Sequence, residues 1–302
     1  MSREPSDAPA AGKAEAPAPG LYVAATPIGN LGDITLRALE TLRHADLVAC
    51  EDTRITARLF ARHAIATPRI AYHEHNAERV LPTIVARLRA GQSVVLVSDA
   101  GTPLISDPGY RLVRAALDAG LPVVPLPGPS AVTAALAAAG LPTDRFHFAG
   151  FAPPRQAARR RAIGELAGLA ATLVWFESPR RLAALLVDLA AVLGPREACV
   201  ARELTKLHEE MRRGPLPELA AHFAAAPARG EVTVLVAPPG RKAPPATDAD
   251  TLDALLVEAL ARRAPSAAAA EVAARTGADR RALYDRAVSL KRAAADKRGS
   301  GA

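Results

Sequence analysis

Two short turns rich in glycine and proline follow apolar runs of the sequence and could hold a ligand against the backbone. The turn SDAGTP spans residues 98–103 after the run VVLV, and PGPSA spans residues 127–131 after PVVPL. Small residues allow a ligand to approach closely, and turns expose backbone N–H groups. Each turn alone is also compatible with an ordinary strand-to-helix connection, but two at successive strand ends favour a binding site.

A dense cluster of charged residues, RELTKLHEE at 202–210, follows another apolar run. One interpretation is a solvated helix in which Glu203 and Lys206 form a pair three residues apart. The other is that Glu203 or Lys206 assists the removal of a proton from a hydroxyl group. The spacing alone does not decide between the two.

Polar residues also gather in EDTR at 51–54 and YHEHN at 72–76, just past the ends of apolar runs. We expect Asp52, Arg54, His75 and Asn76 to contact a polar substrate, although solvated loops would have the same composition. His75 lies two residues from another histidine, but no third metal ligand is evident, so we predict no metal site.

Four arginines fall within RQAARRRA at 155–162. Arginine suits bidentate contacts with phosphate, which makes Arg159, Arg160 and Arg161 candidate contacts to a nucleic acid. A solvated basic helix face is the alternative. The segment TPIGNLGD at 26–33 lacks the G-x-G-x-x-G spacing of a dinucleotide site, and its Asp33 is expected to cap the helix that follows.

These residues need elements that position them, and the sequence predicts alternating strands and helices. Short apolar runs at 21–27, 46–51, 68–73, 93–99 and 122–128 have the length and endings of buried strands. Between them, Val80, Ile84 and Leu88 share one face of a helix that Gly91 would end. Such alternation indicates a largely parallel α/β sheet, and ligands bind beyond the carboxyl ends of its strands.

The chain divides by composition into four parts. Residues 1–20 form an Ala/Pro-rich tail expected to be disordered, 21–143 a first α/β domain, 144–239 a second α/β domain, and 240–302 a linker with a small helical domain. The segment 141–154 is expected to act as a hinge. In the second domain we expect strands within 171–179, 197–205 and 230–239, and helices near 156–170 and 180–193. The last two helices, joined by TGA, indicate a helix-turn-helix or an ordinary helical hairpin.

Composition narrows the class of protein. The net charge of +7 suits a polyanionic partner, although a generally arginine-rich proteome would produce it too. Two distant cysteines argue against a disulfide framework. The absence of an apolar leader and of a long apolar stretch predicts a cytoplasmic protein without a membrane span.

Taken in order, nine segments closely resemble the ribosomal RNA small-subunit methyltransferase I family, which belongs to the wider tetrapyrrole-methylase fold. They run from about Leu21 to Pro238: TPIGNLGDIT, EDTR, YHEHN, VSDAGTPLISDPG, PLPGPSA, GLPTDRF, FESPRR, RELTKLHEE and GEVTVLV. The terminal helices resemble the small C-terminal domain of the family. The N-terminal tail falls outside the resemblance.

The resemblance implies two α/β domains with S-adenosylmethionine in the cleft between them, and a homodimer. It implies methyl transfer to the ribose 2′-hydroxyl of a cytidine in 16S rRNA of the small ribosomal subunit, near the decoding centre. Carried over by motif, the residues that line the cofactor pocket would be Ser98, Asp99, Ala100, Gly101, Thr102, Pro103, Pro127, Gly128, Pro129, Ser130 and Ala131, with Phe176 and Glu231 near the adenine.

With that chemistry, the enzyme must align the hydroxyl with the methyl group and help its proton depart. We expect Glu203 and Lys206 to handle charge in catalysis. Arg280, Arg281 and Arg286 would join the other arginines as phosphate contacts.

Two alternatives remain open. A methyltransferase of porphyrin-like substrates would share the fold, but the TPIGNLGD loop and the C-terminal helices argue against it. A non-catalytic RNA-binding assembly factor would have a vestigial pocket, and titration with S-adenosylmethionine would reveal it.

Overall fold

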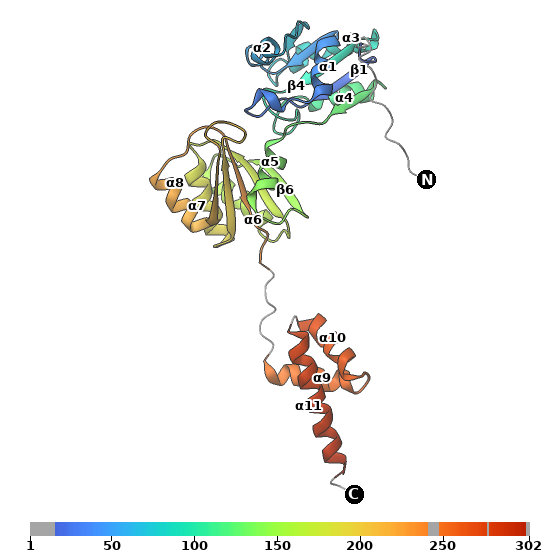
Figure 1. Cartoon of the computed structure of the whole chain (residues 1–302), viewed down its shortest axis with the longest axis vertical. Coiled ribbons are helices and arrows are strands. Elements are labelled where there is room, and N and C mark those ends of the chain that lie inside the picture. Colours follow the sequence, from blue (N-terminus) through green and yellow to red (C-terminus); the bar gives the residue numbers. More distant parts are fainter. Residues whose placement is uncertain (1–15, 241–247, 277, 300–302) are drawn as a thin grey trace, which may run out of the picture. The chain divides into compact units, whose positions relative to one another are not determined.

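The computed structural model describes residues 16–240, 248–276 and 278–299. It divides the chain into two units, Met1–Pro239 and Gly240–Ala302. Figure 1 shows that the first unit carries the strands and that the second is helical. Most of the N-terminal segment predicted as a disordered tail, and most of the linker predicted to follow residue 240, lie outside the described residues.

The first sheet is wholly parallel and has five strands in the order β3-β2-β4-β1-β5. The strands are β1 (Gly20–Ala24), β2 (Leu47–Cys50), β3 (Arg69–Ala71), β4 (Ser93–Val97) and β5 (Val123–Leu126). Four of them lie within the predicted runs, and β1 begins one residue before its run. The parallel α/β sheet expected from the sequence is therefore confirmed.

Helices cover both faces of this sheet because successive strand residues point to opposite sides. Val95 and Val97 of β4 pack in a core with residues of α1 (Leu36–His44) and α2 (Thr53–Arg62). Val94 and Leu96 pack in the opposite core with α3 (Ala77–Arg89) and α4 (Tyr110–Asp118). A strand buried on both faces explains why its sequence is continuously apolar.

Two local predictions about helix ends have different outcomes. Gly91 follows the end of α3 with φ of +80°, as expected for a glycine that terminates a helix. Asp33 does not cap α1, because it lies in a short 3-10 helix, Leu31–Asp33. The cap is Thr35, whose hydroxyl accepts a hydrogen bond from the N–H of Ala38 at 3.2 Å.

The second sheet is mixed and has the order β6-β7-β10-β8-β9. Its strands are β6 (Phe146–Phe151), β7 (Thr172–Glu177), β8 (Glu197–Arg202), β9 (Glu210–Pro215) and β10 (Val232–Val236). Only β6 and β7 are parallel, and the other pairs are antiparallel. The three predicted strands are confirmed, whereas β9 was not predicted and β6 occupies the segment expected to be a hinge.

One face of the second sheet is covered by α6 (Gln156–Leu166), α7 (Leu182–Leu193) and α8 (Leu216–Ala225), which share a core with Trp175. The other face is covered by α5 (Ala131–Ala139). Leu136 of α5 packs in one cluster with Val174, Cys199 and Leu235 of the second sheet, and Figure 1 shows α5 beside that sheet. Thus α5 packs with the second sheet, although its residues fall within the range predicted for the first domain.

The second unit has three helices within its described residues: α9 (Ala249–Leu260), α10 (Pro265–Thr276) and α11 (Arg280–Gly299). Leu256, Ala269, Val272 and Leu283 belong to their common core. Of the TGA connection, Gly277 lies outside the described residues. Among the helices of the described ranges, none has the length and apolar character needed to cross a membrane.

Candidate active site

A cavity of about 390 Å³ lies where the two sheets of the first unit meet. The first sheet contributes the turn after β4. The second sheet contributes the last residues of β7 and the first residues of β10, and the start of α5 completes the wall. Seven of the predicted cofactor residues line this cavity: Ala100, Gly101, Thr102, Ser130, Ala131, Phe176 and Glu231.

The remaining predicted cofactor residues lie elsewhere. Ser98 and Asp99 line a second cavity of about 300 Å³, which also includes Lys206. Pro103, Pro127, Gly128 and Pro129 line neither of these two cavities.

The two glycine- and proline-rich turns are held against each other and against the loop after β1. Thr102 donates its hydroxyl to the carbonyl of Pro129 at 3.2 Å. Gly101 and Thr26 exchange backbone hydrogen bonds at 2.8 and 3.0 Å. Gly101 has φ of +79°, a conformation that favours glycine. One side-chain and two backbone hydrogen bonds thus fix the floor of the first cavity.

The second sheet supplies an aromatic wall. Phe176 packs edge-on against Phe148 and Phe151, with ring centroids 4.8 and 5.8 Å apart. Phe151 is 56% exposed and lines the first cavity together with Phe176. An exposed ring at a cavity mouth provides a flat apolar surface for a planar ligand.

Acidic side chains lie around the two cavities. Burial raises the pKa of Asp107, which lines the first cavity. Burial likewise raises the pKa of Asp99, whose carboxylate accepts a hydrogen bond from the N–H of Asp52 at 2.9 Å. The pKa of Glu51 is raised by burial and by the nearby charges of Asp99 and Asp107. Such a set of carboxylates favours a ligand with positive charge.

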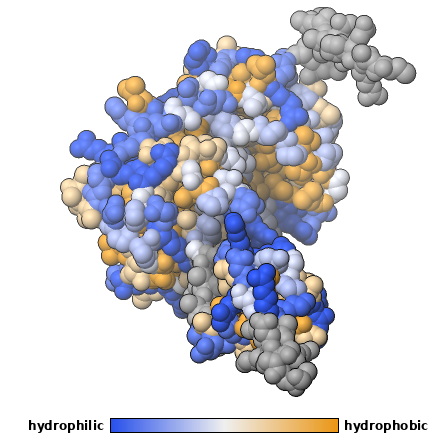
Figure 2. Space-filling model, turned by 60° about the horizontal axis from the view of Figure 1, so that its bottom comes forward, coloured by the Kyte–Doolittle hydropathy of each residue, from blue (hydrophilic) through white to orange (hydrophobic). Residues whose placement is uncertain are grey.

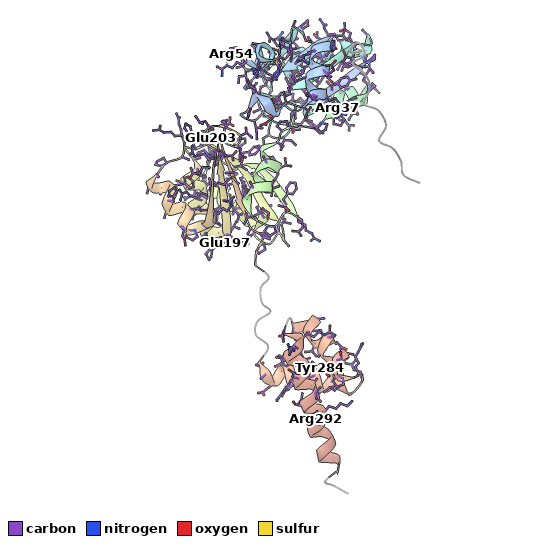
Figure 3. All side chains as sticks on the ribbon, in the orientation of Figure 1. Arg37, Arg54, Glu197, Glu203, Tyr284 and Arg292 are labelled. Atoms are coloured by element: carbon purple, nitrogen blue, oxygen red, sulfur yellow. The ribbon has the colours of Figure 1, made fainter. Side chains whose placement is uncertain are left out.

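Lys206 joins two glutamates beside the second cavity. Its ammonium group lies 2.8 Å from Glu203 Oε1 and 3.1 Å from Glu231 Oε2. Glu203 also accepts a hydrogen bond from the N–H of Glu231 at 2.9 Å. Figure 3 shows Glu203 at the end of the second sheet opposite Glu197, the first residue of β8.

The segment that carries this cluster is a tight turn, so the helix interpretation of residues 202–210 is wrong. Glu203 and Thr205 have φ of +52° and +66°. Gly230, with φ of +81°, packs so closely that a Cβ there would overlap the Glu203 side chain. The turn, rather than a regular helix, places Glu203 beside Lys206, and the close fit against Gly230 holds it there.

The pairing sets the charge of both groups. The hydrogen bond from Lys206 lowers the pKa of Glu203. For Lys206, burial opposes the charge, but the hydrogen bonds with Glu203 and Glu231 prevail and raise its pKa. Lys206 is therefore an ammonium ion at neutral pH, which makes it a source of positive charge and a poor proton acceptor.

The predicted substrate residues of the first domain line neither cavity. Asp52 caps α2 and pairs with Arg54 at 2.6 Å, and this hydrogen bonding lowers its pKa to about 2. Arg54 points outward and its side chain is 89% exposed (Figure 3). Asn76 bonds the backbone of His73 and Ala71, which is a structural role in the turn before α3. His75 is exposed.

The arginines of α6 differ in their availability. Arg159 is 7% exposed and pairs at 2.6 Å with Asp188, which is wholly buried. It is therefore not available to a phosphate, contrary to the prediction. Arg160 also pairs with Asp188 at 2.6 Å but is 45% exposed, and Arg161 is exposed.

Comparison with known proteins identifies the family. The family described as Tetrapyrrole (Corrin/Porphyrin) Methylases matches residues 20–220, and the RsmI C-terminal HTH domain matches residues 245–291. A protein of Mesorhizobium japonicum named ribosomal RNA small subunit methyltransferase I is 52% identical over 93% of this chain and 96% of its own length. The chain belongs to the ribosomal RNA small subunit methyltransferase I family.

A second family member, from Pseudomonas aeruginosa and with the same name, is 47% identical over 89% of this chain and 96% of its own length. Solved structures share the fold at lower identity. A cobalt precorrin-4 methyltransferase aligns with a TM-score of 0.57 and 21% identity, covering 72% of this chain and 94% of that one. A Thermus thermophilus uroporphyrin-III C-methyltransferase complexed with S-adenosyl homocysteine has a TM-score of 0.52 and 20% identity, covering 72% and 97%.

Several residues that line the first cavity of this family member were not predicted as site residues. Asp107 belongs to the segment VSDAGTPLISDPG, and positive φ angles at Leu104 and Ser106 bring the segment to the cavity. Its repeated Ser-Asp pair was a usable signal. Phe151 lay in the expected hinge, and only the recognition of β6 as a strand would have placed it beside Phe176.

Proposed function

We propose that this protein transfers a methyl group from S-adenosylmethionine to the ribose 2′-hydroxyl of a cytidine in 16S rRNA, near the decoding centre. The family membership supports an rRNA substrate, because the relatives are named for it. A protein of the same fold, described as complexed with S-adenosyl homocysteine, supports the methyl donor. The observation that carries the proposal is the pair of adjoining cavities, of which the second includes Lys206.

The residues of the first cavity fit S-adenosylmethionine. The volume falls within the roughly 300–1,000 Å³ that small-molecule sites occupy. Phe151 and Phe176 provide apolar surface for the adenine, and the carboxylates of Asp107 and Glu231 suit a cationic ligand. Ser130 and Ala131 place the N-terminus of α5 at the wall, where the carboxylate of the ligand would be favoured.

When bound, S-adenosylmethionine supplies a methyl group on a sulfonium that leaves as a neutral thioether. The chain's own residues must then increase the nucleophilicity of the ribose oxygen. The ammonium group of Lys206, held by Glu203 and Glu231, would stabilise negative charge developing on that oxygen. Asp99 lines the same cavity, and because burial raises its pKa it accepts a proton more readily than an exposed aspartate.

Labelled S-adenosylmethionine and small ribosomal subunits test the proposal. Subunits from cells that lack this protein should accept one methyl group each, and nuclease digestion should release 2′-O-methylcytidine. Subunits from cells that contain the protein are the control and should accept none. A base-methylated nucleoside, or no transfer to either preparation, would contradict the proposal.

A further inference from the structure

The second cavity lies beside the first and opens onto the surface of the first sheet's domain. It is lined by the loop after β1, the residues after β4, one side of α2, and Lys206 with Glu231. Ile28, Ala100 and Glu231 line both cavities. The two cavities therefore adjoin at these shared residues.

The walls of the second cavity combine apolar surface with charges of both signs, since Arg58 and Lys206 are cations and Asp99 and Glu231 are carboxylates. Leu31, Ile55 and Leu59 are lining residues, and Leu31 and Ile55 are 38% and 42% exposed. Arg58 lies on α2, is exposed and forms no ion pair with another residue in the described part of the chain. A nucleotide removed from its stack needs apolar contact for its faces and cations for its phosphates.

We propose that the second cavity receives the nucleotide to be methylated, with Ile55 against its base or sugar and Arg58 at a flanking phosphate. The proposal rests on the function proposed above and adds the residues of α2 that position the RNA. Proteins recognise single-stranded RNA by splaying nucleotides out of their stack, and a cavity of about 300 Å³ next to the first cavity provides a place for one. Ile55 and Arg58 belong to neither glycine-rich turn and were not among the residues predicted from the sequence.

Filling the cavity is the first test. Ile55→Trp would occupy the space with an indole, and the site is exposed enough to tolerate the larger side chain. We expect methyl transfer to small subunits to fall at least about tenfold, and subunit binding in a sedimentation assay to weaken. The affinity for S-adenosylmethionine, measured by calorimetry, should stay within about twofold, because Ile55 does not line the first cavity. Val187→Trp on α7, at a site of 46% exposure, is the matched control.

Removing the cation is the second test, and it does not depend on the tolerance of a large side chain. Arg58→Ala should raise the KM for small subunits roughly tenfold. Arg62→Ala is the matched control, because Arg62 is exposed on the same helix but does not line the cavity. It should leave the KM unchanged.

The outcomes separate the two proposals. If the wild-type protein does not methylate small subunits, the proposed function fails. If the wild type is active and both variants match their controls, the inference about α2 is overturned while the proposed function stands. Loss of S-adenosylmethionine binding in Ile55→Trp would also overturn it, because the second cavity would then belong to the donor site.

Discussion

At the scale of single residues, charge at the site depends on a few hydrogen bonds. Lys206 keeps its proton because two glutamates contact it, and Asp99 holds its proton more tightly than an exposed aspartate because it is partly buried. These opposite environments assign the two groups to different tasks. Substitutions of Lys206 and of Asp99 should therefore have different effects.

Replacing Lys206 by methionine keeps the length of the side chain and removes its charge. We expect the turnover number to fall about a hundredfold, the size of effect seen when a group that stabilises transition-state charge is removed. Binding of S-adenosylmethionine should change little, because Lys206 does not line the first cavity. Arg114→Met, at an exposed cation of α4, should retain full turnover. An unchanged turnover number in Lys206→Met would remove this residue from the mechanism.

Replacing Asp99 by asparagine should separate activity from stability. The amide oxygen can still accept the hydrogen bond from Asp52, but it cannot take a proton. We expect the wild-type rate of methyl transfer to rise with pH as Asp99 ionises, and the Asp99→Asn variant to be slower and to lack this rise.

The same substitution should stabilise the protein near neutral pH. Burial raises the pKa of Asp99 in the folded state, so stability falls as the pH rises from the pKa of the unfolded chain, and the loss is complete above the raised pKa. Below the pKa of the unfolded chain both states are protonated, and the difference in unfolding free energy should vanish. Urea unfolding at several pH values measures this, with Asp118→Asn as the exposed control. A destabilised Asp99→Asn at neutral pH would contradict it.

At the scale of elements, a tight turn shapes the site, and a buried ion pair joins two helices that cover the second sheet. The turn of Glu203 and Thr205 fits against Gly230, and α6 is fixed to α7 through Asp188. Both features can be tested with controls inside the same chain.

Gly230→Ala should strain the backbone and, in addition, displace the Glu203 side chain. Gly230 and Gly91 have nearly equal φ angles of +81° and +80°. A Cβ at Gly230 would overlap Glu203, whereas a Cβ at Gly91 meets nothing within 4 Å. Gly91→Ala should therefore cost only about 1 kcal/mol of unfolding free energy, with normal activity. Gly230→Ala should cost more and also slow methyl transfer, and equal behaviour of the two variants would refute the proposed role of the turn.

Asp188→Ala should destabilise the fold by roughly 3–5 kcal/mol, because it leaves the buried Arg159 without its partner. Urea denaturation near neutral pH measures the loss, and Asp118→Ala, an exposed pair, should change stability by less than about 1 kcal/mol. Burial opposes ionisation of Asp188, but hydrogen bonds from Arg160 and Arg159 prevail and lower its pKa. The contribution of the Asp188 pair to the unfolding free energy is therefore fully present above the ordinary pKa of aspartate. It is lost as the pH falls through the lowered pKa of Asp188. A loss as small as that of the control would show that the pair is dispensable.

The first sheet could be predicted from the sequence because its strands are mainly short apolar runs between turn residues, although β3 begins with an exposed arginine. β6 and β9 could not, because their residues are mostly half-exposed and mix polar with apolar types. The packing of α5 could not be predicted either. Val132 and Leu136 show which face of α5 is apolar, but they do not show which sheet that face contacts. The two turns of the site were visible as sequence patterns. Phe151 reaches the cavity through tertiary folding, which spacing does not reveal, whereas the repeated Ser-Asp pair was a usable signal for Asp107.

At the scale of the whole molecule, the positive charge is uneven. Residues 240–302 hold twelve Lys and Arg against eight Asp and Glu, which places +4 of the chain's +7 in about a fifth of its length. Arg280 and Arg281 are exposed at the start of α11, whereas Arg286 pairs with Asp253.

Figure 2 shows hydrophilic residues over much of the face it presents, with hydrophobic residues in separate patches. The homodimer implied by the resemblance stays a prediction.

Binding to small ribosomal subunits should weaken with salt because cations on the protein displace counterions from phosphates. We expect the affinity to fall roughly tenfold or more between about 50 and 200 mM salt. Arg281→Ala should reduce the slope of log affinity against log salt by about 1. Arg114→Ala should leave the slope unchanged. A salt-independent affinity would show that the charge serves another purpose.

The attachment of α5 to the second sheet has a practical consequence for anyone who wishes to split this chain into separately produced fragments. A cut at residue 143 would carry α5 away with the first sheet and strip Val174, Cys199 and Leu235 of their cover. A cut between β5 and α5 would keep α5 with the second sheet that it covers. It would also divide the first cavity between the fragments, so that a ligand bound there would draw the two pieces together.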